Sequence, residues 1–255
     1  MSTRASILGL LALAALTTGC IQPRAVGHFG DGAFYLTRGH YRVRYASAGA
    51  PRLLADAWRL ESYRFDERGH PIEASRDPRF LHTYDAQALV PTLRPGRHQG
   101  ALVMERYDLW FRHEDGRGAI WARSAPLAHR WSGMDPIHLA HAGVYGIDGR
   151  WGPPPDLIGL GMPTHLLVGV HRERLARVDG QSAYTMTFDL VPRADPGARP
   201  SRTTIIVVQP PSAIFAERRV RARMAVVFGC TSPPERHDEV LADLEQLVRR
   251  VDFAP

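Results

Sequence analysis

Apolar, β-favouring segments that occur in pairs across short turns constrain the fold of this chain more than any other sequence feature. Arg106–His113 and Ala119–Ala125 flank the sequence EDGRG, and His165–Arg174 and Ser182–Val191 flank VDGQ. An Asp-Gly step between two such segments is typical of a β-hairpin, because glycine tolerates the positive φ that a tight turn requires. Strands joined in this way pair antiparallel. The sequence therefore predicts a mainly antiparallel sheet.

Further segments of the same kind raise the expected total to about eight strands. Ala33–Thr37 and Tyr41–Ala46 are divided by Arg38-Gly39-His40, and Thr203–Gln209 precedes Val220–Cys230. A single sheet built from all of these segments needs both halves of the chain, so one domain is expected over residues 33–255.

Helices are expected at two places, which makes the predicted fold class α+β. Residues 232–235 read SPPE, the form of a capping box with proline at the first helical position. A weaker pattern predicts a second helix from Asp135-Pro136 towards Tyr145. After the capping box, apolar residues recur every three or four positions, as on one face of a helix: Val240, Leu241, Leu244, Leu247, Val248 and Val251.

The N-terminal segment has the pattern of a lipoprotein signal peptide. Residues 1–20 read MSTRASILGLLALAALTTGC, with Arg4 before the apolar stretch Ala5–Leu16. Such a stretch suits a signal peptide and is too short to span a bilayer. Gly19-Cys20 resembles the end of a bacterial lipobox, in which the cysteine is acylated. Thr17 departs from that pattern, since the preferred large aliphatic residue comes one place early, and a secreted protein with a chance cysteine is the alternative.

We therefore expect a signal peptide over residues 1–19 and a tether over residues 20–32. Acyl chains such as palmitate on Cys20 would hold the protein on a membrane, since each buried CH₂ contributes ~0.8 kcal/mol. Ile21 follows the cysteine. By resemblance to the enterobacterial sorting rule, the absence of aspartate there implies the outer membrane, with the domain facing the periplasm. With Cys20 lipidated, Cys230 has no disulfide partner, and we interpret it as a small buried residue.

The charge pattern argues against nucleic acid as a partner. All 32 basic residues are arginine, against 26 acidic residues, and the chain contains neither lysine nor asparagine. A GC-rich genome explains this composition, and anion recognition by the planar guanidinium is the alternative. The arginines are scattered among apolar residues instead of forming a basic tract, so no nucleic-acid partner is expected.

Two histidines suggest a metal site as an alternative function. His138 and His141 are three residues apart on the predicted helix, and imidazoles so spaced can share a metal. With Asp135 or His165 as a third ligand, they would form the site of a metal-dependent hydrolase. The glutamate of an H-E-x-x-H motif is missing, however. Our main expectation is therefore that the protein has no cofactor and does not catalyse a reaction.

The segment over residues 145–163, YGIDGRWGPPPDLIGLGMP, is rich in glycine and proline and is predicted to be a long loop. Long loops on a rigid sheet often carry binding residues. Tyr145, Arg150 and Trp151 are the candidates here, because an aromatic ring with an arginine can stack on a sugar or bind an anionic group. The alternative is a connector whose tryptophan packs against the core.

Several of these elements together resemble the PsbP-like domain, a family named for an extrinsic subunit of the photosynthetic oxygen-evolving complex. The resemblance lies in strand Tyr41–Tyr45 followed by Trp58, in the hairpin Val178–Tyr184, and in strand Arg223–Cys230 followed by helix Glu235–Val251. It implies an antiparallel sheet between helices, as in a sandwich. The chain is also similar to proteobacterial lipoproteins, a resemblance that implies no activity.

The sequence thus predicts a membrane-anchored periplasmic lipoprotein that acts as a binding or scaffolding module in the cell envelope. Its expected partners are the membrane, through lipid on Cys20, and an envelope protein or an anionic or glycan ligand. The metal-dependent hydrolase that uses His138 and His141 is the alternative.

Overall fold

The computed structural model describes fourteen stretches of the chain, which contain sixteen strands, two α-helices and one 3₁₀-helix. The described residues are 27–30, 32–36, 41–47, 52–65, 71–74, 81–84, 102–105, 107–127, 131, 133–145, 157, 165–210, 214–217 and 220–253.

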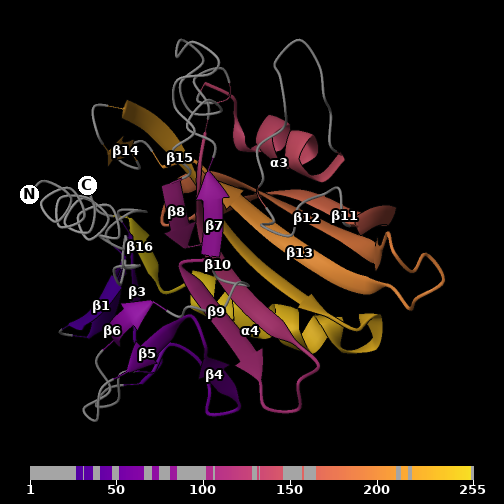
Figure 1. The fold of residues 1–255 in the computed structure, drawn as a ribbon, viewed down its shortest axis with the longest axis horizontal. Coiled ribbons are helices and arrows are strands. Elements are labelled where there is room, and N and C mark those ends of the chain that lie inside the picture. Colours follow the sequence, from indigo (N-terminus) through magenta and orange to yellow (C-terminus); the bar gives the residue numbers. More distant parts are fainter. Residues whose placement is uncertain are drawn as a thin grey trace, which may run out of the picture.

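The largest element is an eight-stranded antiparallel sheet (Figure 1). Seven of its strands follow one another in the order β11-β12-β13-β15-β10-β9-β4, and β14 pairs with β15 beside that path. Their bounds are β4 (Trp58–Leu60), β9 (Leu109–His113), β10 (Ala119–Pro126), β11 (His165–Val178), β12 (Gln181–Pro192), β13 (Ser201–Val208), β14 (Ile214–Glu217) and β15 (Val220–Ser232).

A smaller four-stranded sheet brings the last strand of the chain beside the first ones. It has the order β1-β2-β3-β16. Two separate two-stranded pairs, β5–β6 and β7–β8, complete the described strands. The bounds are β1 (Gly27–Gly30), β2 (Ala33–Leu36), β3 (Tyr41–Arg44), β5 (Tyr63–Phe65), β6 (Pro71–Ala74), β7 (Leu81–Tyr84), β8 (Leu102–Glu105) and β16 (Val251–Phe253).

The two α-helices cover opposite faces of the large sheet, and each face has its own core cluster. Helix α4 (His237–Val248) follows the 3₁₀-helix η2 (Pro234–Arg236), whereas α3 (Pro136–Tyr145) follows β10 (Figure 1). Side chains alternate between the faces along each strand. On the α4 face the cluster includes Val43, Phe111, Ile120, Phe228 and Leu244. On the α3 face it includes Trp121, Leu139, Met186, Phe188 and Ile205.

The structure confirms the predicted fold class, a mainly antiparallel α+β arrangement. Every predicted strand and both predicted helices are present, with bounds that differ by a few residues. Of the eight predicted strands, six lie in the large sheet, whereas β2 and β3 lie in the smaller one. The described part of the chain contains further short strands, such as β4 and β16, that the sequence does not predict. One further strand, β1, lies inside the predicted tether and pairs with β2.

The predicted capping box at residues 232–235 is wrong. Ser232 is the last residue of β15, and its hydroxyl lies 3.0 Å from Nδ1 of His237 instead of capping the helix. Neither η2 nor α4 has a side-chain hydrogen bond at its N-cap. Val251, which the apolar pattern placed on the helix, begins β16. The strand ends at Ser232 and helical structure begins at Pro234, so the proline in the first helical turn is confirmed and the serine cap is not.

Cys230 is fully buried in the α4-face cluster, as predicted. Burial raises the pKa of its thiol to about 12, so the nucleophilic thiolate is strongly disfavoured. Among the helices that the structure describes, none is long and apolar enough to cross a membrane.

Candidate functional site

The three binding residues predicted on the 145–163 loop are only partly described. Tyr145 ends α3 and is 45% exposed, and its hydroxyl donates to Glu173 Oε1 at 3.4 Å. Arg150 and Trp151 lie outside the described residues, as does Cys20. Leu157, from the same predicted loop, is fully buried in the α3-face cluster. Part of this segment therefore belongs to the core.

The two histidines of the alternative metal site contact different partners. His138 Nδ1 lies 2.8 Å from Asp135 Oδ1, within the first turn of α3. His141 Nε2 lies 3.2 Å from Glu173 Oε1 and 3.3 Å from the Tyr184 hydroxyl. Over the described part of the chain, no three His, Cys, Asp or Glu residues form a group that could hold a metal. The hydrolase hypothesis gains no support from this geometry.

An open cleft lies on the α3 face of the large sheet, at the end where β9 turns into β10. Its volume is about 530 Å³. The turn between β9 and β10 forms one wall, and the connection between β12 and β13 forms the other. It is lined by Tyr107, Trp110, Arg112, Gly116, Arg117, Gly118, Ala119, Trp121, Arg199, Pro200, Ser201, Thr231, Ser232 and Pro233.

The floor of this cleft is aromatic. Trp110 and Trp121 lie directly opposite each other in the β9–β10 ladder. The ring of Tyr107 lies 4.6 Å from that of Trp110 and 5.5 Å from that of Trp121, measured between centroids. Trp121 is almost fully buried and Trp110 is half-buried. Packed aromatic groups of this kind form a rigid platform with a large apolar surface.

A glycine on the neighbouring strand makes room for this floor. Gly229 of β15 pairs with Trp121 in the β10–β15 ladder. A Cβ atom at Gly229 would lie 2.2 Å from Cζ2 of the Trp121 ring, far inside van der Waals contact. The indole therefore lies over the bare backbone of β15, in a position that no other residue type at 229 allows without a shift.

Three arginines from separate segments form the rim of the cleft. Arg112 comes from β9, Arg117 from the β9–β10 turn and Arg199 from the connection before β13. The lining residues include no acidic side chain. The rim is therefore positively charged above an apolar floor.

The wall formed by the β9–β10 turn is held in place by Asp115. The carboxylate accepts a hydrogen bond from the backbone N–H of Arg117 at 2.8 Å and forms an ion pair with Arg236 of η2. The bond from Arg117, with the neighbouring positive charges, lowers the pKa of Asp115 to about 2. Gly116, with φ of +72°, provides the left-handed conformation that the turn requires.

The opposite wall is also linked to η2. Arg199 Nη2 donates to Glu235 Oε2 at 3.1 Å. Glu235 and Arg236 therefore form ion pairs with different walls of the cleft, and Pro233 lines the space between them. The 3₁₀-helix therefore contacts both walls of the cleft.

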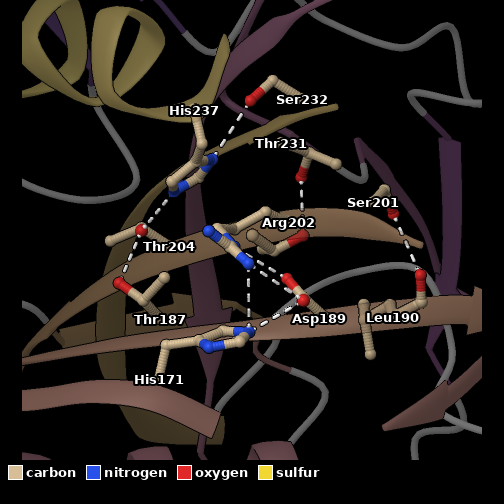
Figure 2. A network of polar contacts seen from close by, with 11 residues as sticks. His171, Thr187, Asp189, Leu190, Ser201, Arg202, Thr204, Thr231, Ser232 and His237 are labelled. Atoms are coloured by element: carbon tan, nitrogen blue, oxygen red, sulfur yellow. Dashed lines mark hydrogen bonds and ion pairs between the residues drawn. The ribbon is translucent and has the colours of Figure 1, made fainter. Parts of the chain in front are cut away.

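The α4 face of the sheet carries a buried chain of hydrogen bonds next to this end of the sheet (Figure 2). His237 Nε2 lies 2.7 Å from the Thr204 hydroxyl, which lies 2.8 Å from the Thr187 hydroxyl. The other ring nitrogen of His237 lies 3.0 Å from the Ser232 hydroxyl. Burial, assisted by the charge of Arg202, lowers the pKa of His237 to about 4. This histidine is therefore neutral at pH 7, with both nitrogens engaged.

Beside this chain, Asp189 joins Arg202 to His171 (Figure 2). Arg202 Nε donates to Asp189 Oδ1 at 2.9 Å, and His171 Nε2 lies 2.7 Å from Asp189 Oδ2. Burial alone raises the pKa of Asp189, but the hydrogen bonds from Arg202 and His171 outweigh it, and the net pKa is lowered. No described hydroxyl is hydrogen-bonded to His171, so this group lacks the nucleophile of a catalytic triad.

Sequence analysis missed the cleft because its residues are spread over segments that only the fold brings together. The turn sequence EDGRG did predict the β9–β10 hairpin. A register derived from that hairpin places Trp110 opposite Trp121, and this is the one local signal that could have revealed the aromatic floor.

The chain is similar to two solved structures in overall fold. The solution structure of cyanobacterial PsbP (CyanoP) from Synechocystis sp. PCC 6803 has 10% sequence identity and a TM-score of 0.42, covering 92% of this chain and 96% of that chain. The crystal structure of LpqN, involved in cell envelope biogenesis of Mycobacterium tuberculosis, has 11% identity and a TM-score of 0.36, covering 82% of this chain and 87% of that chain.

One of these two proteins is a PsbP, the family that the sequence resembles. No protein-family model and no curated protein matches the chain. At such low identities and TM-scores, neither similarity carries information about function.

Proposed function

We propose that this protein is a ligand-binding module of the cell envelope and that the cleft between the β9–β10 turn and the β12–β13 connection is its binding site. The observation that carries the proposal is the pair Trp110 and Trp121, which forms a rigid apolar floor beneath a rim of arginines. Ligand sites are typically concave and mostly apolar, with a few polar groups and volumes of roughly 300–1,000 Å³. The cleft, at about 530 Å³, falls within this range.

The residues around the cleft favour binding over catalysis. A nucleophile requires a neighbouring base, and the lining set contains no histidine, cysteine, aspartate or glutamate. Ser232 is hydrogen-bonded to His237, but both side chains are buried. The lowered pKa of His237 also makes it a weak base. Thr231, the residue before Ser232, lies on the opposite face of the sheet from the Ser232 side chain, and its hydroxyl is 3.1 Å from the hydroxyl of its ladder partner Thr203.

Binding in the cleft can be tested with a side chain that fills it. Ala119 lines the cleft, so Ala119→Trp should block it. Ala242→Trp is the matched control, because Ala242 is an exposed residue of α4, on the opposite face of the sheet. The probes are phenol, phenyl phosphate, glucose and glucose 1-phosphate, and the measurement is NMR of the indole N–H signals of Trp110 and Trp121.

We expect at least one probe to shift these signals in a saturable way in the wild-type protein and in Ala242→Trp, but not in Ala119→Trp. If no probe binds, or if binding is the same in both variants, the cleft is not a ligand site.

The envelope location rests on the sequence of residues 1–20, in which Gly19-Cys20 follows a signal-like apolar stretch. Lipid on Cys20 would attach the protein to a membrane, and Ile21 favours the outer membrane, with the cleft facing the periplasm. A scaffolding role, in which an envelope protein is the partner, is compatible with the same anchor.

Cell fractionation tests the anchor. Cys20→Ser should move the protein from the membrane fraction to the soluble periplasmic fraction, or arrest its maturation. Cys230→Ser is the control and should remain with the membrane, because Cys230 is buried in the core. A Cys20→Ser protein that stays in the membrane fraction would contradict lipid anchoring.

A further inference from the structure

The charges around the cleft are arranged to leave one guanidinium available. Arg112 Nη1 lies 3.9 Å from Glu61 Oε1, and Arg199 is hydrogen-bonded to Glu235. In the described part of the chain, the side chain of Arg117 makes no hydrogen bond or ion pair; only its backbone N–H bonds to Asp115. Arg117 is exposed on the turn and lines the cleft.

The carboxylates next to the cleft, those of Asp115 and Glu235, already form ion pairs with other residues. Asp115 forms its ion pair with Arg236, and its Oδ1 lies 2.8 Å from His113 Nδ1. Glu235 contacts Arg199 at the edge of the cleft. No acidic side chain lines the space itself, so a negative group placed there is near three arginines, and Glu235 on Arg199 is a carboxylate that it must displace.

The aromatic floor of the cleft favours a ligand that contains a ring. Trp121 and Tyr107 are almost fully buried and support the half-buried Trp110, on whose exposed apolar surface an aromatic ring or the apolar face of a sugar ring can pack. Ser201 also lines the cleft; its hydroxyl donates to the carbonyl oxygen of Leu190 and keeps its acceptor lone pairs for a polar ring substituent.

We infer that the ligand of this cleft is an anion that carries a phosphate or carboxylate group on a ring, with the ring on the tryptophan floor and the anionic group on Arg117 and Arg199. The inference rests on the proposed function and deepens it. A guanidinium binds phosphate or carboxylate through two parallel hydrogen bonds, which makes arginine the best suited side chain for this contact.

Glu235 has a specific part in this arrangement. Its carboxylate accepts a hydrogen bond from Arg199, so an incoming anion competes with it for the same guanidinium. Both side chains are largely exposed, and exposed ion pairs are weak, so the ligand can displace the carboxylate. Glu235 thereby lowers the affinity for the ligand and excludes weak anions from the site.

Affinities of phenyl phosphate, glucose 1-phosphate, inorganic phosphate, phenol and glucose, measured by titration calorimetry, test the inference. We expect at least one ring phosphate to bind at least tenfold more tightly than inorganic phosphate and than its neutral ring. Phenyl phosphate and glucose 1-phosphate distinguish an aromatic ligand from a sugar ligand. Arg117→Gln should weaken ring-phosphate binding at least tenfold, since charge-assisted hydrogen bonds are among the strongest in proteins.

Two further variants complete the test. Glu235→Gln should strengthen binding of the ring phosphate severalfold, because the competing charge is removed. Arg172→Gln is the control and should leave the affinity within twofold, because Arg172 is an exposed residue of β11, remote from the cleft lining.

The inference is overturned if neutral rings bind as tightly as ring phosphates, if inorganic phosphate alone binds as well, or if Arg117→Gln has no effect. Neutral-ring binding that Ala119→Trp abolishes would overturn this inference and leave the proposed function standing. If no probe binds, or if Ala119→Trp blocks none of the binding, both this inference and the proposed function are overturned.

Discussion

Trp121 of β10 lies over Gly229 of β15, and the two residues are paired in the ladder between these strands. A Cβ at position 229 would lie 2.2–2.5 Å from three carbon atoms of the indole ring. This contact fixes the height of the aromatic floor above the sheet. The shape of the cleft therefore depends on a glycine that does not line it.

Gly229→Ala should destabilise the protein by about 1–3 kcal/mol, because the added methyl group overpacks the site and forces Trp121 or the backbone of β15 to move. It should also change the near-ultraviolet circular dichroism of the tryptophans. Urea denaturation measures the loss of stability. Gly133→Ala is the control: a Cβ there meets nothing within 4 Å, and the change should stay within ~0.5 kcal/mol. Equal denaturation midpoints for the two variants would contradict the contact.

A second prediction concerns Leu157, which lies in the segment between α3 and β11. Its side chain is fully buried in the α3-face cluster. Leu157→Ala should therefore cost ~2–5 kcal/mol in the free energy of unfolding, as for other large-to-small core changes. A Gly/Ser linker in place of residues 147–160 should lower the thermal midpoint for the same reason. Leu175→Ala, at a leucine that is 75% exposed, should change stability by less than ~0.5 kcal/mol. A small effect at Leu157 would show that this leucine is not part of the core.

Cys230 should be inert in the folded protein. The chain has two cysteines, so the Cys20→Ser variant leaves Cys230 as the one thiol. Its raised pKa, about 12, suppresses the thiolate, and the α4-face cluster covers it. An aromatic disulfide reagent should react with one thiol per chain in concentrated urea, and in buffer only as fast as the protein unfolds. Fast labelling in buffer would contradict this burial.

The strand pairs and helices could be predicted because their signals are local. Asp-Gly occupies both central hairpin turns, and Gly116 and Gly180 have φ of +72° and +74° there. The capping box at Ser232 failed because pairing with Arg202 on β13 keeps this residue in the strand, and His237 takes its hydroxyl. Tertiary pairing here outweighs a local motif.

The candidate site was beyond sequence reasoning for a related reason. The β10–β15 ladder brings Trp121 and Gly229 together. Arg117 and Arg199 come from two different turns of the chain that line the same cleft, and nothing in the sequence links these turns. The histidines, by contrast, were conspicuous in the sequence, yet His138 and His141 contact separate partners. Spacing along the chain reveals chemistry within one element, whereas this cleft depends on register between elements.

His237 should make the stability of the protein depend on pH in the mildly acidic range. Its pKa is about 4 in the folded state, below the ordinary value of 6.5, because burial disfavours the charged imidazolium. The unfolded chain therefore binds more protons between these values, and its free energy falls relative to the folded state as the pH decreases. The contribution of His237 is fully present above pH 6.5 and is lost as the pH falls to about 4.

The loss of folding stability due to His237 between pH 6.5 and 4 should be on the order of 3 kcal/mol, at 1.36 kcal/mol per pKa unit. Urea denaturation of the wild type and of His237→Gln at pH 7.5, 6, 5 and 4 measures it. Glutamine has no titrating group, so the stability difference between the two proteins should shrink as the pH decreases through this range. Ala242→Gln is the control, because it changes an exposed position of α4 and removes no titrating group, so its difference from the wild type should stay nearly constant. A pH profile that is the same for the wild type and His237→Gln would show that the buried imidazole is not the group that titrates.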